Sequence, residues 1–133
     1  MEAGFTIAEV AEHTGLTAHT LRYYERAGLL SPPSRGTNGH RRYSELDLGM
    51  LRILTRLRAT GMSIAEMRRY AQLCRSGPAT FEARRVLLEE HRQQVLDRIA
   101  GLRADLESIE TKIKLYAEGD SRDLPVRRER ARP

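Results

Sequence analysis

Arginine, tyrosine and hydroxyl side chains gather between residues 17 and 43, in a stretch that contains LRYYERAGLL at 21–30 and RGTNGHRRY at 35–43. An arginine side chain can hold a guanine edge or a phosphate with two hydrogen bonds. Tyrosine, threonine and histidine add single hydrogen bonds to phosphates or to base edges. This combination of residue types is typical of a surface that binds nucleic acid.

The charge distribution agrees with that interpretation. Five arginines accompany a single acid, Glu25, between residues 17 and 43, and six arginines accompany three acids between residues 44 and 78. The first sixteen residues carry only acids, and residues 79–118 are nearly neutral, so the net charge of +5 is concentrated in the front half of the chain. A polyanion would be attracted to that half. Compositional bias explains why arginine outnumbers lysine, but it does not explain the clustering.

Two short helices joined by a tight turn are predicted to carry the first part of this surface. Thr6 and Glu9 form the pattern of a capping box, and apolar residues then follow at helical spacing until Gly15 ends the helix. Thr17 can cap a second helix that runs to about Ala27. Two helices at this spacing give the outline of a helix-turn-helix.

A short β-wing is predicted after the second helix. Pro32 and Pro33 exclude a helix, and the sequence TNG at 37–39 favours a tight turn. We expect residues 29–30 on one side and 40–43 on the other to pair as two strands. The wing would then present Arg35, Arg41 and Arg42.

Three more helices are predicted. The third, capped by Ser44 with Asp47, buries a stripe of Leu48, Leu51, Ile53, Leu54 and Leu57. The fourth, capped by Ser63 with Glu66 and running over about 64–74, buries Met62, Ile64, Met67, Tyr70 and Leu73. Thr80 can cap a final helix that ends near Ala117 and extends for ~57 Å. Its apolar positions, which are the candidate dimerisation residues, are Leu88, Val95, Ile99, Leu102, Leu106, Ile109, Ile113 and Tyr116.

The final helix needs a partner. From Val95 onward its apolar residues alternate steps of four and three, which is the seam of a coiled coil. A head that ends before the helix starts cannot cover a stripe of this length, so a second copy of the chain is the simplest partner. We therefore predict a DNA-binding head over 1–75, a linker over 76–79, a dimerisation helix over 80–118 and a disordered polar tail over 119–133.

The sequence resembles the MerR family of bacterial transcription regulators over nearly its whole length, through LRYYERAGLL, NGHRRY and RATGMSIAEMRRY (58–70). The long helix is most similar to a branch with aldehyde-responsive and electrophile-responsive members. The resemblance implies a mainly α fold, with a winged helix-turn-helix head and an antiparallel coiled-coil dimer. It also implies a homodimer that bends promoter DNA between the −35 and −10 elements, so that RNA polymerase can use both.

Candidate DNA contacts follow from the predicted helix and wing. We expect Leu21 in the core, Tyr24 at its boundary with a hydroxyl free to reach phosphate, and contacts to bases and backbone from Thr17, His19, Thr20, Arg22 and Tyr23. In the wing the candidates are Arg35, Asn38, Gly39, Arg41, Arg42 and Tyr43. Ser63, at a helix N-terminus, and Arg58 nearby in the sequence are expected to hold a phosphate.

An effector site is less well marked. Cys74 is the single cysteine, so one chain cannot form a two-thiolate metal site, and residues 51–55 lack the cysteine that the electrophile-responsive branch carries in its third helix. Cys74 is either a thiol switch beside Arg75 or an inert cysteine. Met67, Tyr70, Leu73 and Phe81 either line a pocket for a small apolar ligand or belong to the core. No metal or cofactor is expected.

Several function classes are disfavoured. The acidic N-terminus is unlike a signal peptide, and no apolar run is long enough to span a membrane. One cysteine fits a reducing cytoplasm, where we expect the protein to be associated with the nucleoid. No catalytic grouping of residues stands out, so we do not expect an enzyme. Two alternatives are an architectural or developmental DNA-binding regulator that needs no effector, and a coiled-coil module whose head binds protein.

Overall fold

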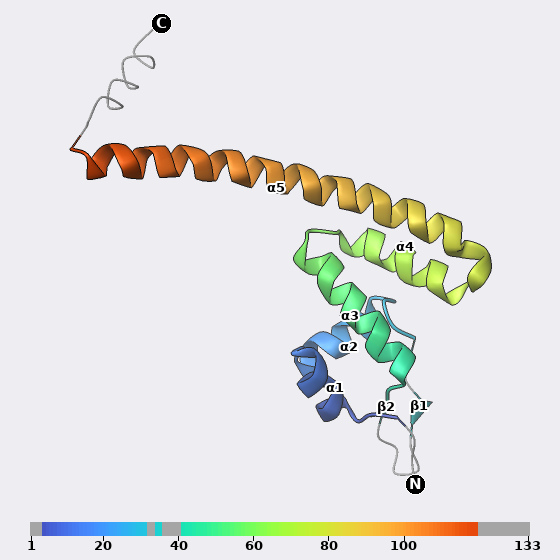
Figure 1. The fold of residues 1–133 in the computed structure, drawn as a ribbon. Helices are drawn as coiled ribbons and strands as arrows, with labels where there is room; N and C mark the ends of the chain where they lie inside the picture. Colours follow the sequence, from blue (N-terminus) through green and yellow to red (C-terminus); the bar gives the residue numbers. More distant parts are fainter. Residues whose placement is uncertain (1–3, 32–33, 36–40, 120–133) are drawn as a thin grey trace, which may run out of the picture. The chain divides into compact units, whose positions relative to one another are not determined.

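The computed structural model describes residues 4–31, 34–35 and 41–119 of the 133-residue chain. Its secondary structure consists, in chain order, of α1 (Ile7–Thr14), α2 (Ala18–Arg26), β1 (Ser34–Arg35), β2 (Arg41–Arg42), α3 (Glu45–Ala59), α4 (Ile64–Arg75), the 3-10 helix η1 (Pro78–Thr80) and α5 (Phe81–Ala117) (Figure 1). The chain divides into a head, Met1–His91, and a second unit, Arg92–Pro133. The division lies inside α5, after the position predicted for the linker.

The predicted caps of the first two helices are confirmed. Thr6 Oγ1 accepts a hydrogen bond from the backbone N–H of Glu9 at 3.1 Å, and the Glu9 carboxylate accepts one from the N–H of Thr6 at 2.8 Å. Gly15 ends α1 with a φ of 75°, where a side chain would be strained. Thr17 caps α2 by accepting from the N–H of Thr20 at 3.0 Å. These bonds fix the turn between the two helices of the helix-turn-helix.

The later helices also begin where they were predicted to, but one of the predicted caps is different. Ser44 and Asp47 form a capping box on α3, and Ser63 accepts from the N–H of Glu66 at 3.1 Å at the start of α4. Thr80, which was expected to cap α5, instead lies in η1 and donates its hydroxyl proton to carbonyl oxygens of the preceding turn, 2.6 Å away at Leu73. The hydroxyl therefore ties η1 to the end of α4.

The core of the head lies between α3, the helix-turn-helix and α4. The predicted α3 stripe is confirmed, because the buried residues include Leu48, Leu51, Leu54 and Leu57. Leu29 and Leu30 were predicted to form a strand, and this is wrong, because the first strand begins at Ser34; both leucines lie buried in the core. The strands are shorter and later: β1 and β2 pair antiparallel, with Ser34 opposite Arg42 and Arg35 opposite Arg41. The leucines were misplaced because their burial requires them to turn inward before the wing begins.

The base of the wing is fixed to the start of the chain by a backbone bridge. Phe5 and Tyr43 exchange two hydrogen bonds, of 2.7 and 2.8 Å, between their backbone N–H and C=O groups. Gly4, with a φ of 92°, precedes this bridge, and a Cβ there would lie 2.7 Å from the carbonyl oxygen of Tyr43. Only glycine fits such an approach, so the first described residue is adapted to hold the wing.

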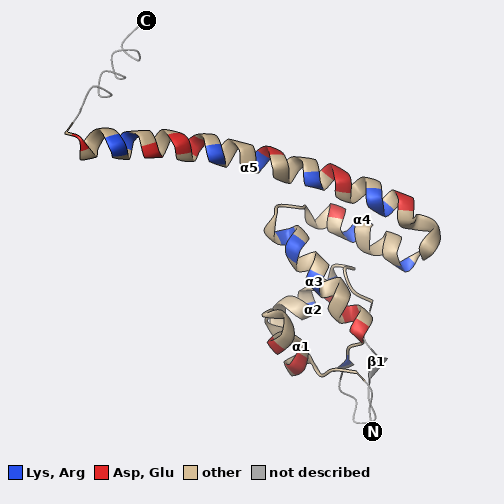
Figure 2. Cartoon of the chain, in the orientation of Figure 1, with Lys and Arg blue, Asp and Glu red and all other residues tan. Residues whose placement is uncertain are grey.

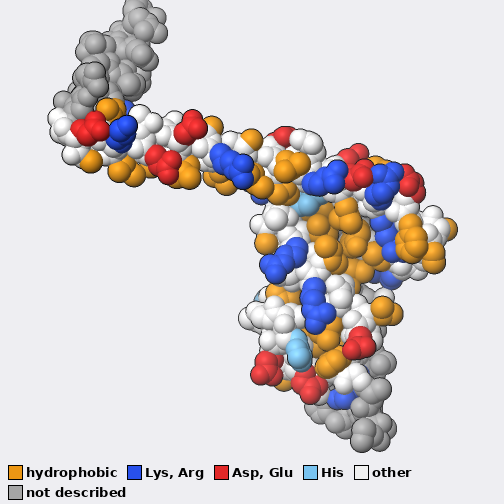
Figure 3. Space-filling model, in the orientation of Figure 1, with side chains coloured by type: hydrophobic (Ala, Val, Ile, Leu, Met, Phe, Trp, Pro, Cys, Tyr) orange, Lys and Arg blue, Asp and Glu red, His pale blue; other side chains and the backbone are white. Residues whose placement is uncertain are grey.

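Helix α5 continues past the head with an exposed apolar stripe. Ile99 is 39% exposed, and Leu102, Leu106, Ile109, Ile113 and Tyr116 are between 52% and 62% exposed. Hydrophobic side chains recur along one edge of this part of α5 (Figure 3). Leu88 was predicted to belong to the dimer seam, but it is half-buried against the core of the head. Its position in α5 before the end of the head explains the difference.

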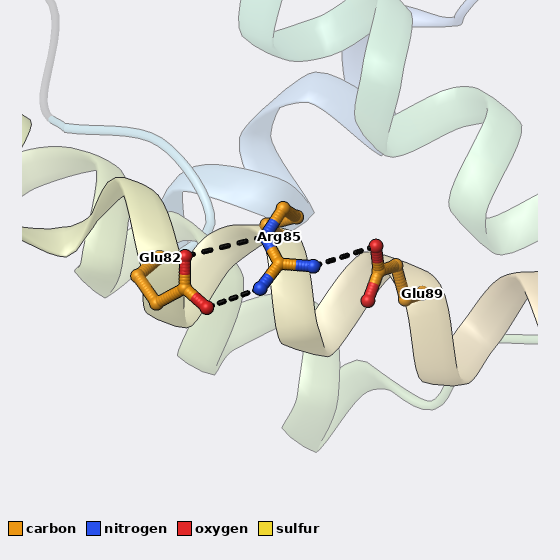
Figure 4. A network of polar contacts seen from close by, with 3 residues as sticks. All are labelled: Glu82, Arg85 and Glu89. Atoms are coloured by element: carbon orange, nitrogen blue, oxygen red, sulfur yellow. Dashed lines mark hydrogen bonds and ion pairs between the residues drawn. The ribbon is translucent and has the colours of Figure 1, made fainter.

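The first turns of α5 carry an exposed ion-pair network. Arg85 donates to the Glu89 carboxylate at 2.7 Å and makes two bonds to Glu82 (Figure 4). Hydrogen bonds from Arg85 hold the pKa of the Glu82 carboxyl below its ordinary value. All three residues lie on the same face of one helix at spacings of three and four. Arg85 therefore pairs with acids of its own helix.

Candidate nucleic-acid interface

Helix α2 has a buried face and an exposed face. Leu21 is fully buried and Tyr24 is 5% exposed, whereas Arg22 and the 39%-exposed Tyr23 face outward. The two tyrosine rings lie with their centroids 6.1 Å apart, so the buried ring supports the exposed one. Tyr24 belongs to the core, and its contact with a phosphate stays a prediction. An arginine and a tyrosine therefore project from a helix that is anchored by their neighbours.

The N-terminal end of α2 presents polar groups. Thr17 Oγ1 donates to Thr20 Oγ1 at 3.0 Å while it accepts from the Thr20 N–H, so the hydroxyl proton of Thr17 is already used within this turn. Among the described residues, the hydroxyl proton of Thr20 has no acceptor. His19 is exposed beside them. A ligand at this end would meet the hydroxyl of Thr20, the imidazole of His19 and the positive end of the helix dipole.

The wing brings Arg35 and Arg41 opposite each other across the two strands. Their side chains, and the whole of Asn38 and Gly39, lie outside the described residues. Arg42 is half-buried and donates to the carbonyl oxygen of Gly4 at 3.2 Å. Its charge also helps to lower the pKa of the Glu9 carboxyl, after the larger effect of the Thr6 backbone hydrogen bond. Arg42 therefore contributes to holding the wing against the start of the chain.

The predicted contact of Tyr43 with a phosphate requires an exposed side chain, but Tyr43 is buried. It is 1% exposed, and its hydroxyl donates to the carboxylate of Glu25 in α2. The bridge with Phe5 directs the ring inward, toward α2, which is the expected recognition helix of the helix-turn-helix. Sequence reasoning missed the role of Glu25. The available signal was that Glu25 is the single acid in a strongly basic segment, where an acid is expected to have a specific partner.

Arg58 and Ser63 flank the turn between α3 and α4, and both are exposed. The turn is closed by hydrogen bonds from the Gly61 N–H to the Arg58 carbonyl oxygen at 3.0 Å and from the Met62 N–H to the Leu57 carbonyl oxygen at 2.9 Å. Basic residues are visible at this end of α3 (Figure 2). The arrangement keeps a cation close in the chain to the free N–H groups at the start of α4, as a phosphate site requires.

Comparison with known proteins identifies the family. Residues 5–74 match the model described as MerR HTH family regulatory protein, and residues 48–112 match the model described as MerR, DNA binding. The chain belongs to the MerR family. It is a DNA-binding transcription regulator of the MerR type, with the winged helix-turn-helix head and long C-terminal helix that the sequence predicted.

Individual relatives agree along most of the chain. An uncharacterised HTH-type transcriptional regulator of Haemophilus influenzae is 38% identical over 112 residues, which cover 84% of this chain and 83% of the relative. The regulator AdhR of Bacillus subtilis is 42% identical over 91 residues, which cover 68% of this chain and 65% of AdhR. The crystal structure of HiNmlR, a MerR family regulator lacking the sensor domain and bound to promoter DNA, superposes with a TM-score of 0.77. It is 36% identical, covering 87% of this chain and 92% of HiNmlR.

One positioning contact of this MerR-family protein was not predicted. Arg68 of α4 donates from Nε to the carbonyl oxygen of Ala27, the C-cap of α2, at 2.6 Å. Its side chain also lies over Gly28, whose added Cβ would be 3.8 Å from Arg68 Cγ. Arg68 and Ala27 are 41 positions apart in the sequence. No local pattern could have revealed this contact, which fixes the end of the recognition helix to α4.

The residues considered for an effector site differ in their exposure. Met67 is fully buried in the core, which is the alternative to a pocket lining, whereas Phe81 is 60% exposed. Tyr70 and Cys74 are both half-buried, and burial, followed by a hydrogen bond with Cys74, raises the pKa of the Tyr70 hydroxyl. In the described part of the regulator, no group of three or more His, Cys, Asp or Glu side chains is placed to hold a metal ion, and no helix is long and apolar enough to cross a membrane.

Proposed function

We propose that the protein acts as a homodimer that binds promoter DNA through α2 and the wing of each head. The exposed Arg22 and Tyr23, projecting from a helix whose other face is buried, carry this proposal. Recognition helices of this class place their N-terminal residues against base edges, and a wing adds contacts to the backbone. HiNmlR, which is bound to promoter DNA, supports the same mode of binding.

Dimerisation is supported by the exposed stripe of α5. Six large apolar side chains exposed to water along one helix, at coiled-coil spacing, match a surface that is covered in the working protein: Ile99, Leu102, Leu106, Ile109, Ile113 and Tyr116. A second copy supplies an identical stripe. Two heads joined in this way would read a pseudo-palindromic site, because a two-fold protein fits a two-fold operator.

Binding by two linked heads would also deform the DNA. The energy that sequence-independent contacts supply can be spent on bending and untwisting the duplex between the two half-sites. Deformation of an over-long promoter spacer would bring its −35 and −10 elements into the arrangement that RNA polymerase uses. The protein would therefore work beside RNA polymerase, on the bacterial chromosome in the cytoplasm.

DNA binding is tested by selecting duplexes from a random pool and measuring the affinity of the selected operator by fluorescence anisotropy. The double substitution Arg22→Ala with Arg41→Ala should abolish specific binding while the protein stays folded. Arg98→Ala, which removes an exposed charge from α5, is the matched control and should bind nearly as tightly as the wild type. Unchanged operator affinity in the double variant would show that α2 and the wing are not the reading surface.

The dimer seam is tested by sedimentation equilibrium. Leu102→Asp with Ile109→Asp places two charges in the proposed seam and should give monomers. Gln94→Asp adds an acid to an exposed position of the same helix outside the stripe, and it should leave the dimer intact. A dimer that persists in the double variant would place the interface elsewhere.

A further inference from the structure

A hollow in the head has no role in the DNA contacts. It has a volume of about 560 Å³ and lies between the first half of α3, the last turns of α4 and the segment that follows α2. Its apolar lining residues are Leu29, Leu30, Leu46, Met50, Ile53 and Ala71. This size is within the range of small-molecule sites, which are mostly apolar with a few polar groups.

Gly49 of α3 gives the hollow an open side. Glycine weakens the interior of a helix, and a crowding neighbour is one reason for its presence there. At Gly49 a Cβ would meet no atom within 4 Å, so none of the described neighbours requires glycine there. A ligand in the hollow could approach the backbone of α3 at this point. Gly49 therefore leaves the surface of α3 open on this side of the hollow.

The polar groups of the hollow are divided between its two ends. At the end formed by α4 lie the hydroxyl of Tyr70, the thiol of Cys74 and the cation Arg75, and Arg84 of α5 also lines the hollow. At the other end lie acids of the first turn of α3, one of which, Asp47, accepts from the Ser44 N–H at 2.8 Å as part of the cap. An anion is therefore favoured at the α4 end.

The two arginines at that end have different roles. Arg84 is held in place, because it donates to Thr80 Oγ1 at 2.9 Å and to the carbonyl oxygen of Gly77 at 2.9 Å. Those bonds satisfy its donors but do not neutralise its charge. Arg75 is exposed and has no hydrogen-bond or ion-pair partner among the described residues. Arg75 is therefore available to bind an anionic group, and Arg84 adds a fixed positive field.

We propose that this hollow binds a small organic anion with an apolar body. The body would lie on Met50, Ile53 and Leu30, and the anionic group would lie beside Arg75 and the hydroxyl of Tyr70. Binding does not depend on the proposed DNA function. A regulatory effect of the ligand would depend on the proposed DNA function. Leu29 and Leu30 follow α2 after Ala27 and Gly28, so a ligand that contacts them would affect the end of that helix.

Cys74 allows occupancy to be measured directly, because it lines the hollow and is the single thiol of the chain. The full-length protein is alkylated with iodoacetamide with and without anilinonaphthalene sulfonate, an aromatic anion of suitable size. Saturating dye should slow the alkylation of Cys74. Dye fluorescence without protection of Cys74 would place the dye on another apolar surface, such as the α5 stripe, and would overturn the proposal.

A pair of glycine variants locates the site. Gly49→Leu fills the open side of the hollow and should remove both the protection of Cys74 and the dye affinity. Gly101→Leu is the matched control, because Gly101 is also a helical glycine with open space around it but lies in α5, away from the hollow. Equal dye binding by the two variants would contradict the site. Gly49 is exposed, so its variant is expected to fold, which far-UV circular dichroism checks.

Charge recognition is tested with a neutral dye of similar shape, N-phenylnaphthylamine. Arg75→Gln should weaken binding of the sulfonate about fivefold, as expected for the loss of one exposed charge pair, and leave the neutral dye unaffected. Arg69→Gln removes an exposed charge from the same helix outside the hollow and should change neither. If the wild type binds both dyes equally, the hollow does not prefer anions. All three measurements are made without DNA, so their outcome is independent of operator binding.

Discussion

Replacing Arg68 with alanine should loosen the C-terminal end of the recognition helix without removing a DNA contact. The substitution deletes the 2.6 Å hydrogen bond to the carbonyl oxygen of Ala27 and the side chain that lies over Gly28. Both features join α4 to α2. The end of α2 would then have to be reordered each time DNA binds, so the loss should appear in operator affinity.

The size of the effect follows from the bond. Hydrogen bonds from charged donors contribute about 1.5–3 kcal/mol, and because Arg68 is exposed, water competes for the guanidinium and the lower end applies. A loss of about 1.4 kcal/mol corresponds to roughly a tenfold lower affinity. Arg68→Lys keeps one donor with a shorter reach and should recover part of the loss. Arg69→Ala, an exposed neighbour with no described partner, is the matched control.

The salt dependence distinguishes positioning from direct contact. Operator affinity of the wild type, Arg68→Ala and Arg69→Ala is measured by fluorescence anisotropy over a range of salt concentrations. A positioning residue lowers affinity by the same factor at every concentration, because no counterion release is lost. If the slope of log affinity against log salt falls by about 1 in Arg68→Ala, Arg68 contacts a phosphate and the reasoning is wrong. An effect equal to that of Arg69→Ala would refute it as well.

Three further predictions concern the stability of the head. Tyr43→Phe removes the hydroxyl that donates to Glu25 and should lower the free energy of unfolding by about 1–2 kcal/mol in urea titrations. The Thr6 backbone hydrogen bond lowers the pKa of the Glu9 carboxyl from 4.5. The ionised carboxylate therefore stabilises the head fully above pH 4.5, and this stabilisation is lost as the pH falls through the lowered pKa. Glu9→Gln should remove that part of the pH dependence of the free energy of unfolding. Gly49→Ala should raise the thermal midpoint through up to about 1 kcal/mol of helix propensity.

The local patterns of the sequence predicted the helices well, because their signals lie within a few residues of each other. The caps at Thr6, Thr17 and Ser44 each join a side chain to the backbone N–H three positions on, and the α3 stripe depends on a repeat of three and four. The wing was predicted less well. Its strands have two residues each, and where Leu29 and Leu30 leave the helix is decided by burial against distant elements.

The candidate site divides in the same way. Outward positions on α2 follow from helical periodicity, so Arg22 and Tyr23 could be assigned to the surface from the sequence. Tyr43 could not be placed, because its direction depends on the backbone bridge with Phe5, which joins segments 38 residues apart in the numbering. The contact of Arg68 with α2 is equally distant. Residue type suggested a phosphate ligand in the basic segment, but tertiary contacts decided which side chains were free.

The arginines of the head are therefore of two kinds, and only one kind should contribute to the salt dependence of DNA binding. Arg42, Arg68 and Arg84 donate to backbone carbonyl oxygens and stabilise the wing, the end of α2 and the end of α4. Arg22 and Arg58 are exposed, with no described partner. Counterions are released only where a cation meets a phosphate, so substitution of Arg58, which is expected to hold a phosphate, should reduce the salt slope by about 1, whereas substitution of Arg84 should not. Equal slope changes at Arg58 and Arg84 would mean that internal hydrogen bonds do not withdraw these arginines from the DNA.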